Sequence, residues 1–276
     1  ETLYGPKSEA LSGYPPIAKS QYIREEFGSE LDRLGNELIE VNPNVIVALG
    51  NTALWALCGR GAISKARGTT CLSTHTVQGF KVLPTYHPAA VQRQWELRPI
   101  SIADLYKAER ESHYPEIRRP KRQIWIEPSL EDLERFYNEY IKPCPILALD
   151  IETSGTQITC VGFGTGTHAL VIPFTDKRRK NRSYWLTTKD ERRAWDFIKR
   201  ICEDRSIKKV MQNGLYDMAF LWRSKGIKMF GAEDDCMLLH HALQPESLKG
   251  LGFLGSVYTD EGSWKWMRTD TLKKDA

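Results

Sequence analysis

The sequence predicts an α/β protein built as two domains. Its 276 residues are enough for two units of ordinary size, each with its own core. Two apolar runs, at 45–49 and 145–149, have the length of buried strands, and residues with helical spacing precede each of them. Strands that alternate with helices are typical of α/β folds. We therefore expect helices packed on a sheet in each half.

Composition excludes several classes of protein. Hydrophobic residues make up 41% of the chain and charged residues 27%, and no apolar run approaches the roughly 18 residues that cross a bilayer. The first residues resemble no export leader, and because the chain lacks an initial Met we expect it to be part of a longer protein. Six cysteines without a Cys-x-x-Cys pair favour reduced thiols in a cytoplasm over a zinc ribbon or a disulfide scaffold. The formal charge of +4 is too small to indicate a nucleic-acid partner.

The first domain is expected at 1–112. Residues 1–20 show no period, whereas apolar residues between Ser20 and Glu40 recur every three or four positions and predict a helix that the Asn42-Pro43 pair ends. Further elements are expected as a strand at 45–49, a turn at 50–52, a helix from 53, a strand at 80–84 and a helix near 102–109.

A linker is expected at 113–123, where two prolines and four basic residues show no period. The second domain is expected at 124–276, and Ser129 with Asp132 resembles a capping box at the start of its first helix. Its elements are predicted as strands at 124–126, 145–152, 158–164, 169–174 and 208–211, with helices at 129–140 and 189–201.

Two acids stand out on a strand of the second domain. Asp150 and Glu152 are one residue apart, so their side chains point to the same face of the strand. Two carboxylates on one face repel each other, and a divalent cation removes that repulsion. The pattern indicates a metal site, with a solvated strand end as the alternative.

A third acid follows about 60 residues later. Asn213-Gly214 predicts a turn, and Asp217 then lies in the first turn of a helix. Phe220 and Leu221, three and four residues on, place Asp217 at the edge of the apolar face. Asp217 can therefore converge on Asp150 and Glu152.

The motifs Asp150-Ile-Glu152 and Asn213-Gly-Leu-Tyr-Asp217 resemble the first two exonuclease motifs of the proofreading domain of family A DNA polymerases, over about 122–258. The resemblance implies an RNase H-like (DnaQ-like) mixed sheet flanked by helices. It also implies metal-dependent 3′-5′ exonuclease activity on single-stranded DNA ends, with two Mg²⁺ or Mn²⁺ ions held by Asp150, Glu152 and Asp217. Glu152 would in addition orient the attacking water.

Further DNA contacts are expected around these acids. Tyr216 and Phe220 are candidates to stack on terminal bases, although both are equally natural core residues, and Asn213 is expected to form the turn and steady its loop. The basic stretch 177–182, followed by two aromatic residues, could grip a phosphate backbone through Lys177, Arg178 and Arg179. A solvated hairpin tip is the alternative.

A fourth acid of the resembled family, in a Tyr-x-x-x-Asp helix, is expected beyond Ala276. The nearest mimic, Trp266-x-x-x-Asp270, comes too early, and its indole offers no hydroxyl. We therefore expect weak activity from this chain alone and a polymerase domain beyond it. This organisation resembles the N-terminal part of a phage-type DNA polymerase, acting in the cytoplasm of a bacterial or phage-infected cell.

The first domain resembles the C-terminal half of a family 4 uracil-DNA glycosylase at 45–50, 66–68 and 84–90. The resemblance implies a partial parallel sheet with helices, and a pocket in which His87 would face the departing uracil. The first catalytic motif and the cluster-binding cysteines of that family have no counterpart, so we expect neither an iron–sulfur cluster nor uracil excision. The vestigial pocket is expected to be lined by Gly50, Asn51, Arg67 and His87.

Three other functions stay open at this point. Both domains could be folds without chemistry that bind DNA or serve as a scaffold. The first domain could still excise uracil with help from a segment outside this sequence. The nuclease could act on RNA, because metal chemistry does not exclude a 2′-hydroxyl.

Overall fold

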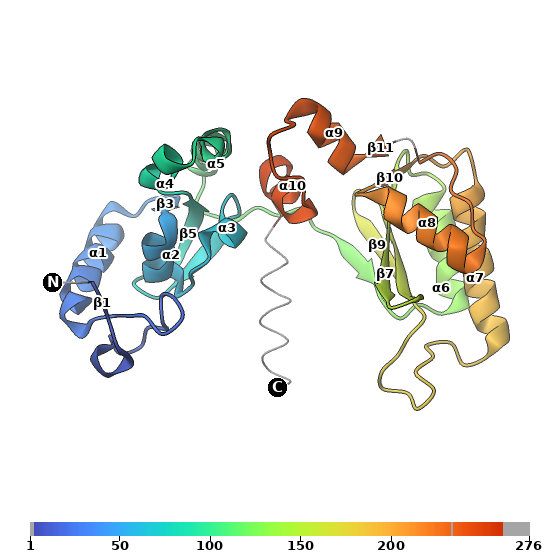
Figure 1. Cartoon of the computed structure of the whole chain (residues 1–276), viewed down its shortest axis with the longest axis horizontal. Helices are drawn as coiled ribbons and strands as arrows, with labels where there is room; N and C mark the ends of the chain where they lie inside the picture. Colours follow the sequence, from blue (N-terminus) through green and yellow to red (C-terminus); the bar gives the residue numbers. More distant parts are fainter. Residues whose placement is uncertain (1–2, 233, 262–276) are drawn as a thin grey trace. The chain divides into compact units, whose positions relative to one another are not determined.

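The computed structural model describes residues 3–232 and 234–261 (Figure 1). The chain divides into two compact units, one made of residues up to Arg119 together with those from Glu246 onward, and the other of Pro120–Pro245. The chain therefore passes between the two units twice. This differs from the expected division into 1–112, 113–123 and 124–276.

The first unit begins with a small antiparallel pair, β1 (Tyr4–Gly5) and β2 (Tyr22–Ile23). The expected helix therefore does not start at Ser20. Ile23 is buried beside Trp55, and its carbonyl accepts a hydrogen bond from Leu11 N at 2.9 Å, so this stretch is held in an extended conformation. Helix α1 runs over Gly28–Val41 instead.

A sheet of three strands forms the centre of the first unit. The strand order is β3 (Ile46–Leu49), β5 (Gln78–Thr85) and β4 (Cys71–Thr74). β3 and β5 are parallel, as expected, but β4 is antiparallel to β5 and was not predicted. The sheet is therefore mixed. The helices that follow α1 are α2 (Gly50–Cys58), α3 (Ile63–Ala66), α4 (Pro88–Arg93) and α5 (Arg98–Glu111).

Residues 246–261 belong to the first unit, whereas the sequence-based division placed them in the second domain. Helix α10 (Leu251–Tyr258) contacts α5, and Arg67 Nη1 donates a hydrogen bond to Ser256 Oγ at 2.9 Å. The Lys107 ammonium donates to Gly68 O at 2.9 Å and to Thr259 O at 2.7 Å. These contacts satisfy buried cations of the first unit with groups from the far end of the chain.

Most of the expected linker is also bound to the first unit. Lys81, buried beneath the sheet, donates hydrogen bonds to the carbonyls of Glu111 at 2.8 Å and Glu116 at 3.1 Å. Arg119 donates to Thr70 O at 3.0 Å. The connection between the units therefore shortens to the few residues before Gln123.

The second unit contains a mixed sheet, as the exonuclease resemblance implied. In spatial order its strands are β11 (Asp234–Asp235), β10 (Lys209–Met211), β7 (Leu147–Ser154), β8 (Gln157–Gly164), β9 (His168–Pro173) and β6 (Gln123–Trp125). β7, β8 and β9 are antiparallel to their neighbours among these three, whereas β11 with β10, β10 with β7, and β6 with β9 pair in parallel.

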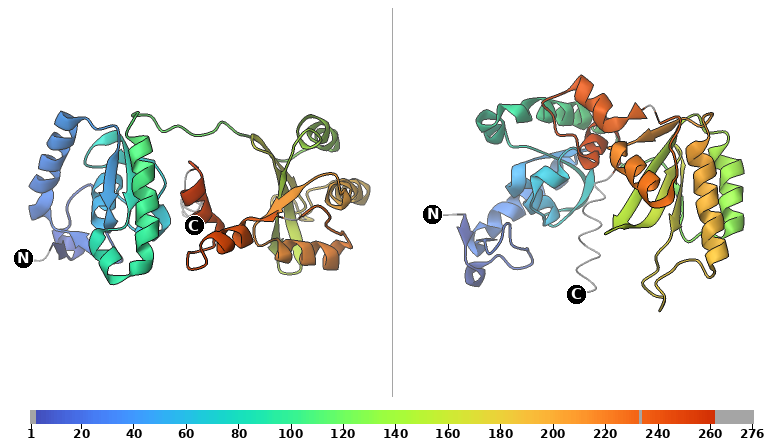
Figure 2. Two further views of the ribbon diagram at one scale, coloured as in Figure 1. Left: turned by 90° about the horizontal axis from the view of Figure 1, so that it is seen from above. Right: turned by 45° about the vertical axis from the view of Figure 1, so that its right-hand side comes forward.

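Helices α6 (Leu130–Phe136) and α7 (Thr188–Glu203) lie side by side on one face of this sheet (Figures 1 and 2). The predicted capping box at Ser129 is confirmed, and a π-helical turn at Tyr137–Ile141 extends α6. The other helices of this unit are α8 (Gly214–Lys225) and α9 (Cys236–Leu243). Within the described residues, no helix is long and apolar enough to span a membrane.

Strand β7 alternates between the core and the open face of the sheet. Leu147, Leu149 and Ile151 are buried in the core of the second unit, whereas Asp150 and Glu152 are exposed on the other face. The predicted placement of both acids on one face of a strand is confirmed. The alternation therefore fixes the face on which chemistry can take place.

Candidate active site

Asp150 and Glu152 stand on the open face of β7, opposite Gly162 and Cys160 of β8. Partial burial and the negative charge of Glu152 raise the pKa of Asp150 above its ordinary value. Burial and the same glutamate raise the pKa of the Cys160 thiol. The two acids therefore sense each other's charge across the face of the strand.

Asp217 is brought to this strand by the turn before α8. Asn213 has φ of 57°, and a Cβ added to Gly214 would lie 2.5 Å from Met211 Cβ, so position 214 requires glycine. The Asp217 carboxylate, only 4% exposed, accepts a hydrogen bond from the Ile151 N–H at 3.2 Å. That N–H lies beyond the end of the β7–β10 ladder, so the carboxylate satisfies a backbone donor and pins α8 to β7.

The charge of Asp217 is coupled to that of Asp150. Burial, and then the negative charge of Asp150, raise the pKa of Asp217 to about 6. Among the described residues, no cation lies within ion-pair distance of Asp150, Glu152 or Asp217. The second unit thus keeps acids that repel one another without an internal counter-ion.

These acids do not form a ready-made metal cage. In residues 3–232 and 234–261, no group of three or more His, Cys, Asp or Glu side chains is close enough to hold a metal ion as it stands. The donors are nevertheless all carboxylate oxygens, the ligands that Mg²⁺ and Mn²⁺ prefer. Their mutual repulsion is a physical reason for them to lie apart when no cation is bound, so the donor chemistry fits such an ion.

Asp235 supports the site and was missed as a site residue. Its carboxylate accepts hydrogen bonds from Gly214 N at 2.7 Å, Asn213 N at 3.2 Å and Met237 N at 2.8 Å. Burial acts to raise its pKa, but these N–H donors outweigh burial and lower the pKa below its ordinary value. An Asp before an apolar helix is recognisable as an N-cap, yet only the fold shows that it also braces the turn before α8.

Tyr216 and Phe220 line a depression of about 370 Å³ beside the site, together with Gly155, Thr156 and Arg223. The Tyr216 hydroxyl lies 2.8 Å from Thr153 Oγ1, and its ring centroid is 5.8 Å from that of Phe220. Asn213 makes no side-chain cap, so its local role is that of a turn former.

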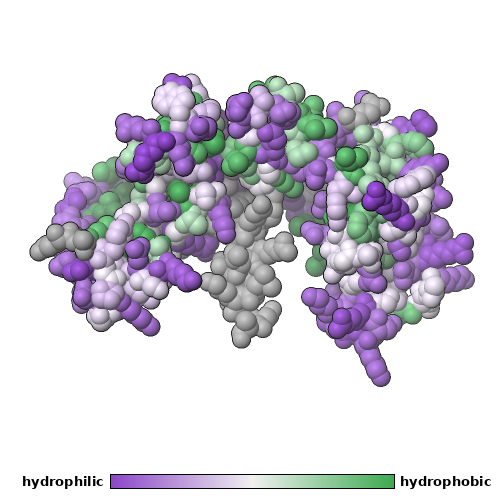
Figure 3. All heavy atoms as spheres, in the orientation of Figure 1, coloured by the Kyte–Doolittle hydropathy of each residue, from purple (hydrophilic) through white to green (hydrophobic). Residues whose placement is uncertain are grey.

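Two cations of the basic stretch 177–182 contact other residues of the protein, although the sequence predicted that they contact DNA. Arg178 is ion-paired with Asp176 and Glu127, and Arg179 pairs with Asp176 and donates to the carbonyl of Tyr184. Hydrophilic side chains dominate this projecting loop (Figure 3). Two of the three cations assigned to DNA are therefore committed to holding the loop, and only Lys177 is free of ion pairs within the described residues.

Three of the four residues of the expected glycosylase pocket lie together. Gly50, Asn51 and His87 line a groove of about 540 Å³ next to α1. Arg67 does not, because it turns toward α5 and forms a buried ion pair with Asp104. His87 Nδ1 accepts the Ala89 N–H at 3.1 Å, so this side chain caps α4.

The nearest mimic of a fourth acid, Trp266 with Asp270, lies outside the described residues.

Comparison with protein families decides which family this site belongs to. A family model described as 3′-5′ exonuclease matches residues 125–265, just over half of the chain. The chain belongs to this 3′-5′ exonuclease family. A second model, the uracil DNA glycosylase superfamily, matches residues 14–111. Both resemblances predicted from the motifs are confirmed, and the chain joins a glycosylase-superfamily domain to an exonuclease domain.

Individual relatives match this chain over different shares of its length. A DNA polymerase of Bacillus phage SP01 is 21% identical over 289 residues, 93% of this chain and 29% of that protein. A type-4 uracil-DNA glycosylase of Thermotoga maritima is 43% identical over 72 residues, 25% of this chain and 36% of that enzyme. Escherichia coli RNase D, described as an exoribonuclease involved in structured RNA processing, matches 51% of this chain and 34% of its own, with 20% identity and a TM-score of 0.36. The chain thus spans about a third of the length of its curated relatives.

Proposed function

We propose that this chain removes nucleotides from the 3′ end of single-stranded DNA in a reaction that depends on Mg²⁺ or Mn²⁺. In this proposal Asp150, Glu152 and Asp217 hold the cation, and the chain is the proofreading module of a larger phage-type DNA polymerase. The observation that carries it is the buried Asp217 carboxylate, which is hydrogen-bonded to Ile151 N beside Asp150 and has no cationic partner among the described residues. A purely structural carboxylate in such a place would be expected to have a counter-ion.

The residues have distinct parts in the proposed reaction. The oxygens of Asp150, Glu152 and Asp217 would hold a divalent cation, which would supply a nucleophilic water at neutral pH and neutralise charge on the departing 3′ oxygen. Asp217 is held in place by the backbone of β7, so its orientation is fixed before substrate arrives. Glu152, exposed on the open face, orients the attacking water by a hydrogen bond. Tyr216, half exposed, offers a ring to the terminal base.

The test uses a 5′-labelled DNA oligonucleotide, an excess of the full chain, and Mn²⁺ or EDTA. We expect slow, stepwise shortening from the 3′ end with Mn²⁺, none with EDTA, and none with the Asp217→Asn variant. A matched RNA oligonucleotide run in parallel tests the substrate, and faster digestion of RNA would overturn the DNA assignment.

A scaffold without chemistry makes the opposite prediction for metal binding. Calorimetric titration with Mn²⁺ should show uptake by the wild-type chain and weaker uptake by Asp217→Asn. Because the variant keeps the size and shape of the side chain, a difference reports the charge itself. Equal and negligible heats for both proteins, together with absence of digestion, would favour the scaffold.

A further inference from the structure

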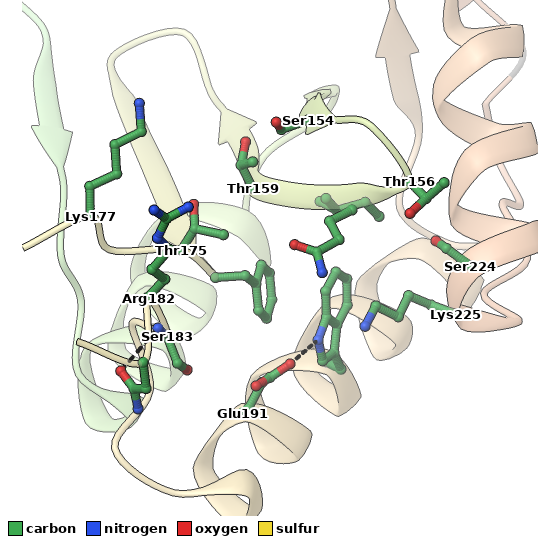
Figure 4. Close-up of a pocket in the computed structure, with 15 residues that line it drawn as sticks. Ser154, Thr156, Thr159, Thr175, Lys177, Arg182, Ser183, Glu191, Ser224 and Lys225 are labelled. Atoms are coloured by element: carbon green, nitrogen blue, oxygen red, sulfur yellow. Dashed lines mark hydrogen bonds between the residues drawn. The ribbon is translucent and has the colours of Figure 1, made fainter. Parts of the chain in front are cut away.

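A second cavity of the exonuclease unit lies at the turn of the β7–β8 hairpin (Figure 4). Its volume is about 610 Å³. Four segments form it: the hairpin turn, the loop between β9 and α7, the first half of α7 and the last turn of α8. It adjoins the depression at Tyr216 and Phe220, and one of its lining residues, Lys177, was predicted from the sequence to contact DNA.

Three of the four charged side chains that line this cavity are cations, and these three make no ion pair within the described residues. Lys177 and Arg182 come from the loop, and Lys225 comes from α8 on the opposite side (Figure 4). No carboxylate of the described residues lies within ion-pair distance of these three side chains. The one acid in the lining, Glu191, accepts a hydrogen bond from the Trp195 indole N–H at 3.4 Å.

The fold of the loop between β9 and α7 leaves Lys177 and Arg182 at the cavity without ion pairs to other described residues. Asp176, 8% exposed, binds Arg178 through its side chain and backbone and also pairs with Arg179. Arg182 has φ of 54°, a left-handed conformation that is uncommon for a residue other than glycine, and its carbonyl accepts the Asp176 N–H at 2.9 Å. Asp176 thus forms ion pairs with Arg178 and Arg179, whereas Lys177 and Arg182 line the cavity.

Aromatic side chains line the same cavity. Phe174 and Trp195 stack with their centroids 3.8 Å apart and their planes at 12°. The Lys225 ammonium lies 4.4 Å from the centroid of the Trp195 ring. Hydroxyl groups of Ser154, Thr156 and Thr159 complete the lining on the hairpin side. Cations with aromatic rings and hydroxyl donors are the combination that binds the backbone and bases of a single strand.

The cavity is continuous with the candidate active site. Thr156 and Ser224 line both this cavity and the depression at Tyr216 and Phe220. Thr159 Oγ1 also donates a hydrogen bond to Glu152 O at 3.0 Å, so the cavity begins at the strand that carries a candidate metal ligand. On its other side, Trp195 and Lys225 are shared with a shallower depression that includes Arg192 and Lys199.

We infer that this cavity is a second binding site for single-stranded DNA, which holds the strand on the 5′ side of the nucleotide placed at Asp150 and Asp217. The inference rests on the proposed function for the position of the 3′ end. Lys177, Arg182 and Lys225 contact phosphates there, and the Trp195 edge of the aromatic pair supports a base. We expect a dinucleotide to occupy only the place at the carboxylates, whereas a longer strand occupies both places.

Binding without turnover tests the inference separately from nuclease activity. Fluorescence anisotropy with the full chain in EDTA compares a labelled dinucleotide with a strand of about 20 nucleotides, which exceeds the span of one single-strand site. The variant is Lys177→Gln with Arg182→Gln, and the matched control is Lys180→Gln, a cation of the same loop outside the cavity lining. None of these side chains makes an ion pair with another described residue, so folding should be unaffected, which circular dichroism checks.

For the double variant we expect about tenfold weaker binding of the long strand, and a salt slope smaller by about 1.4, since each lost phosphate contact removes about 0.7. Dinucleotide binding and the Lys180→Gln control should match wild type. Equal losses in the control and the double variant, or an unchanged long-strand affinity and slope, would overturn the inference. If the double variant loses long-strand binding but the wild-type chain does not digest DNA with Mn²⁺, the second site stands and the nuclease proposal fails. If the wild-type chain digests DNA but the double variant binds the long strand normally, the nuclease proposal stands and the second site is overturned.

Discussion

Buried charges of the first unit are paired within the protein, whereas the clustered acids at the candidate site of the second unit have no counter-ion among the described residues. In the first unit Arg67 pairs with Asp104, and Lys81 pairs with Glu111 at 2.9 Å, with all four side chains nearly inaccessible to solvent. In the second unit Asp150, Glu152 and Asp217 lie near one another, and no described cation is within ion-pair distance. Charge in the first unit is neutralised by the protein itself. The three acids of the second unit have no counter-ion among the described residues, and a bound cation would supply one.

This difference separates structural charge from functional charge. Removing one partner of a buried ion pair leaves the other uncompensated and destabilises a fold. Removing one acid from a cluster of acids that repel one another lowers that repulsion, so the fold is not destabilised and only the binding of a cation is weakened. The same substitution, an acid to a neutral residue, should therefore have opposite consequences in the two units.

The largest expected effect is on digestion. Asp150→Ala should slow shortening of a single-stranded DNA end by about 1,000-fold or more, because a cation ligand that stabilises transition-state charge is lost. The free energy of unfolding in EDTA should stay the same or rise, since Asp150 no longer repels Asp217. A gel assay with labelled oligonucleotide measures the first effect and urea unfolding the second.

Glu131→Gln is the control for that experiment. Glu131 is an exposed acid of α6, a helix that packs on the core face of the sheet, opposite the face that carries Asp150, and neutralising it changes the net charge by the same amount. Digestion by this variant should match wild type. Comparable digestion by Asp150→Ala would mean that Asp150 is not a cation ligand.

The next effect is on the stability of the first unit. Asp104→Ala leaves the Arg67 guanidinium buried and also removes the acceptor of Thr85 Oγ1, so this unit should lose about 3–5 kcal/mol of stability. Hydrogen exchange of the buried amides of α2 reports its opening without interference from the second unit. Glu30→Ala, which breaks an exposed pair with Arg33, should cost less than about 0.5 kcal/mol. A loss near that small value for Asp104→Ala would remove the contrast between the units.

Sequence reasoning succeeded where short-range rules decide the structure. The alternation of β7 placed Asp150 and Glu152 on one face, and the Asn213-Gly214 turn placed Asp217 in the first turn of α8. Each of these features depends on residues only a few positions apart. The capping box at Ser129 is local in the same sense, and it too is observed.

Long-range contacts explain what the sequence could not reveal. Arg67 was placed in a pocket because its neighbours resemble a glycosylase motif, but its partners Asp104 and Ser256 are 37 and 189 residues away. The return of α10 to the first unit depends on the same contacts. In the basic stretch 177–182, five of the six residues are cations that look alike in the sequence, and only the buried position of Asp176 shows which of them are neutralised.

A smaller effect should appear in the pH dependence of stability. The pKa of Asp217 in the folded chain is raised to about 6, above the value of an unfolded aspartate, so the folded state binds the extra proton. This contribution to stability is fully present below about pH 4 and is lost as the pH rises through 6, a decrease on the order of 2 kcal/mol. Urea unfolding in EDTA measures it.

Other acids oppose this trend, so a variant is needed to isolate it. Asp176 and Asp235 have pKa values lowered by hydrogen bonds, and their contributions are lost as the pH falls. The difference between wild type and Asp217→Asn cancels these common terms. That difference should decrease between pH 4 and 6 and then level off, and a flat difference would show that neither burial nor Asp150 raises the pKa of Asp217 in the folded chain.

The smallest expected effect concerns uracil, for which we predict no excision by the first unit. His87 Nδ1 is occupied by the Ala89 N–H, and Arg67 points away from the groove toward Asp104. The acid among the groove's lining residues, Glu30, is paired with Arg33 at 3.0 Å and so is not free to activate water. Uracil-containing DNA incubated with the chain and cleaved with alkali should remain intact in EDTA, which also silences the exonuclease. A separate active glycosylase added to the same DNA shows that the assay works. Strand scission by the chain that disappears in His87→Ala would show that this groove is catalytic and would place chemistry in both units.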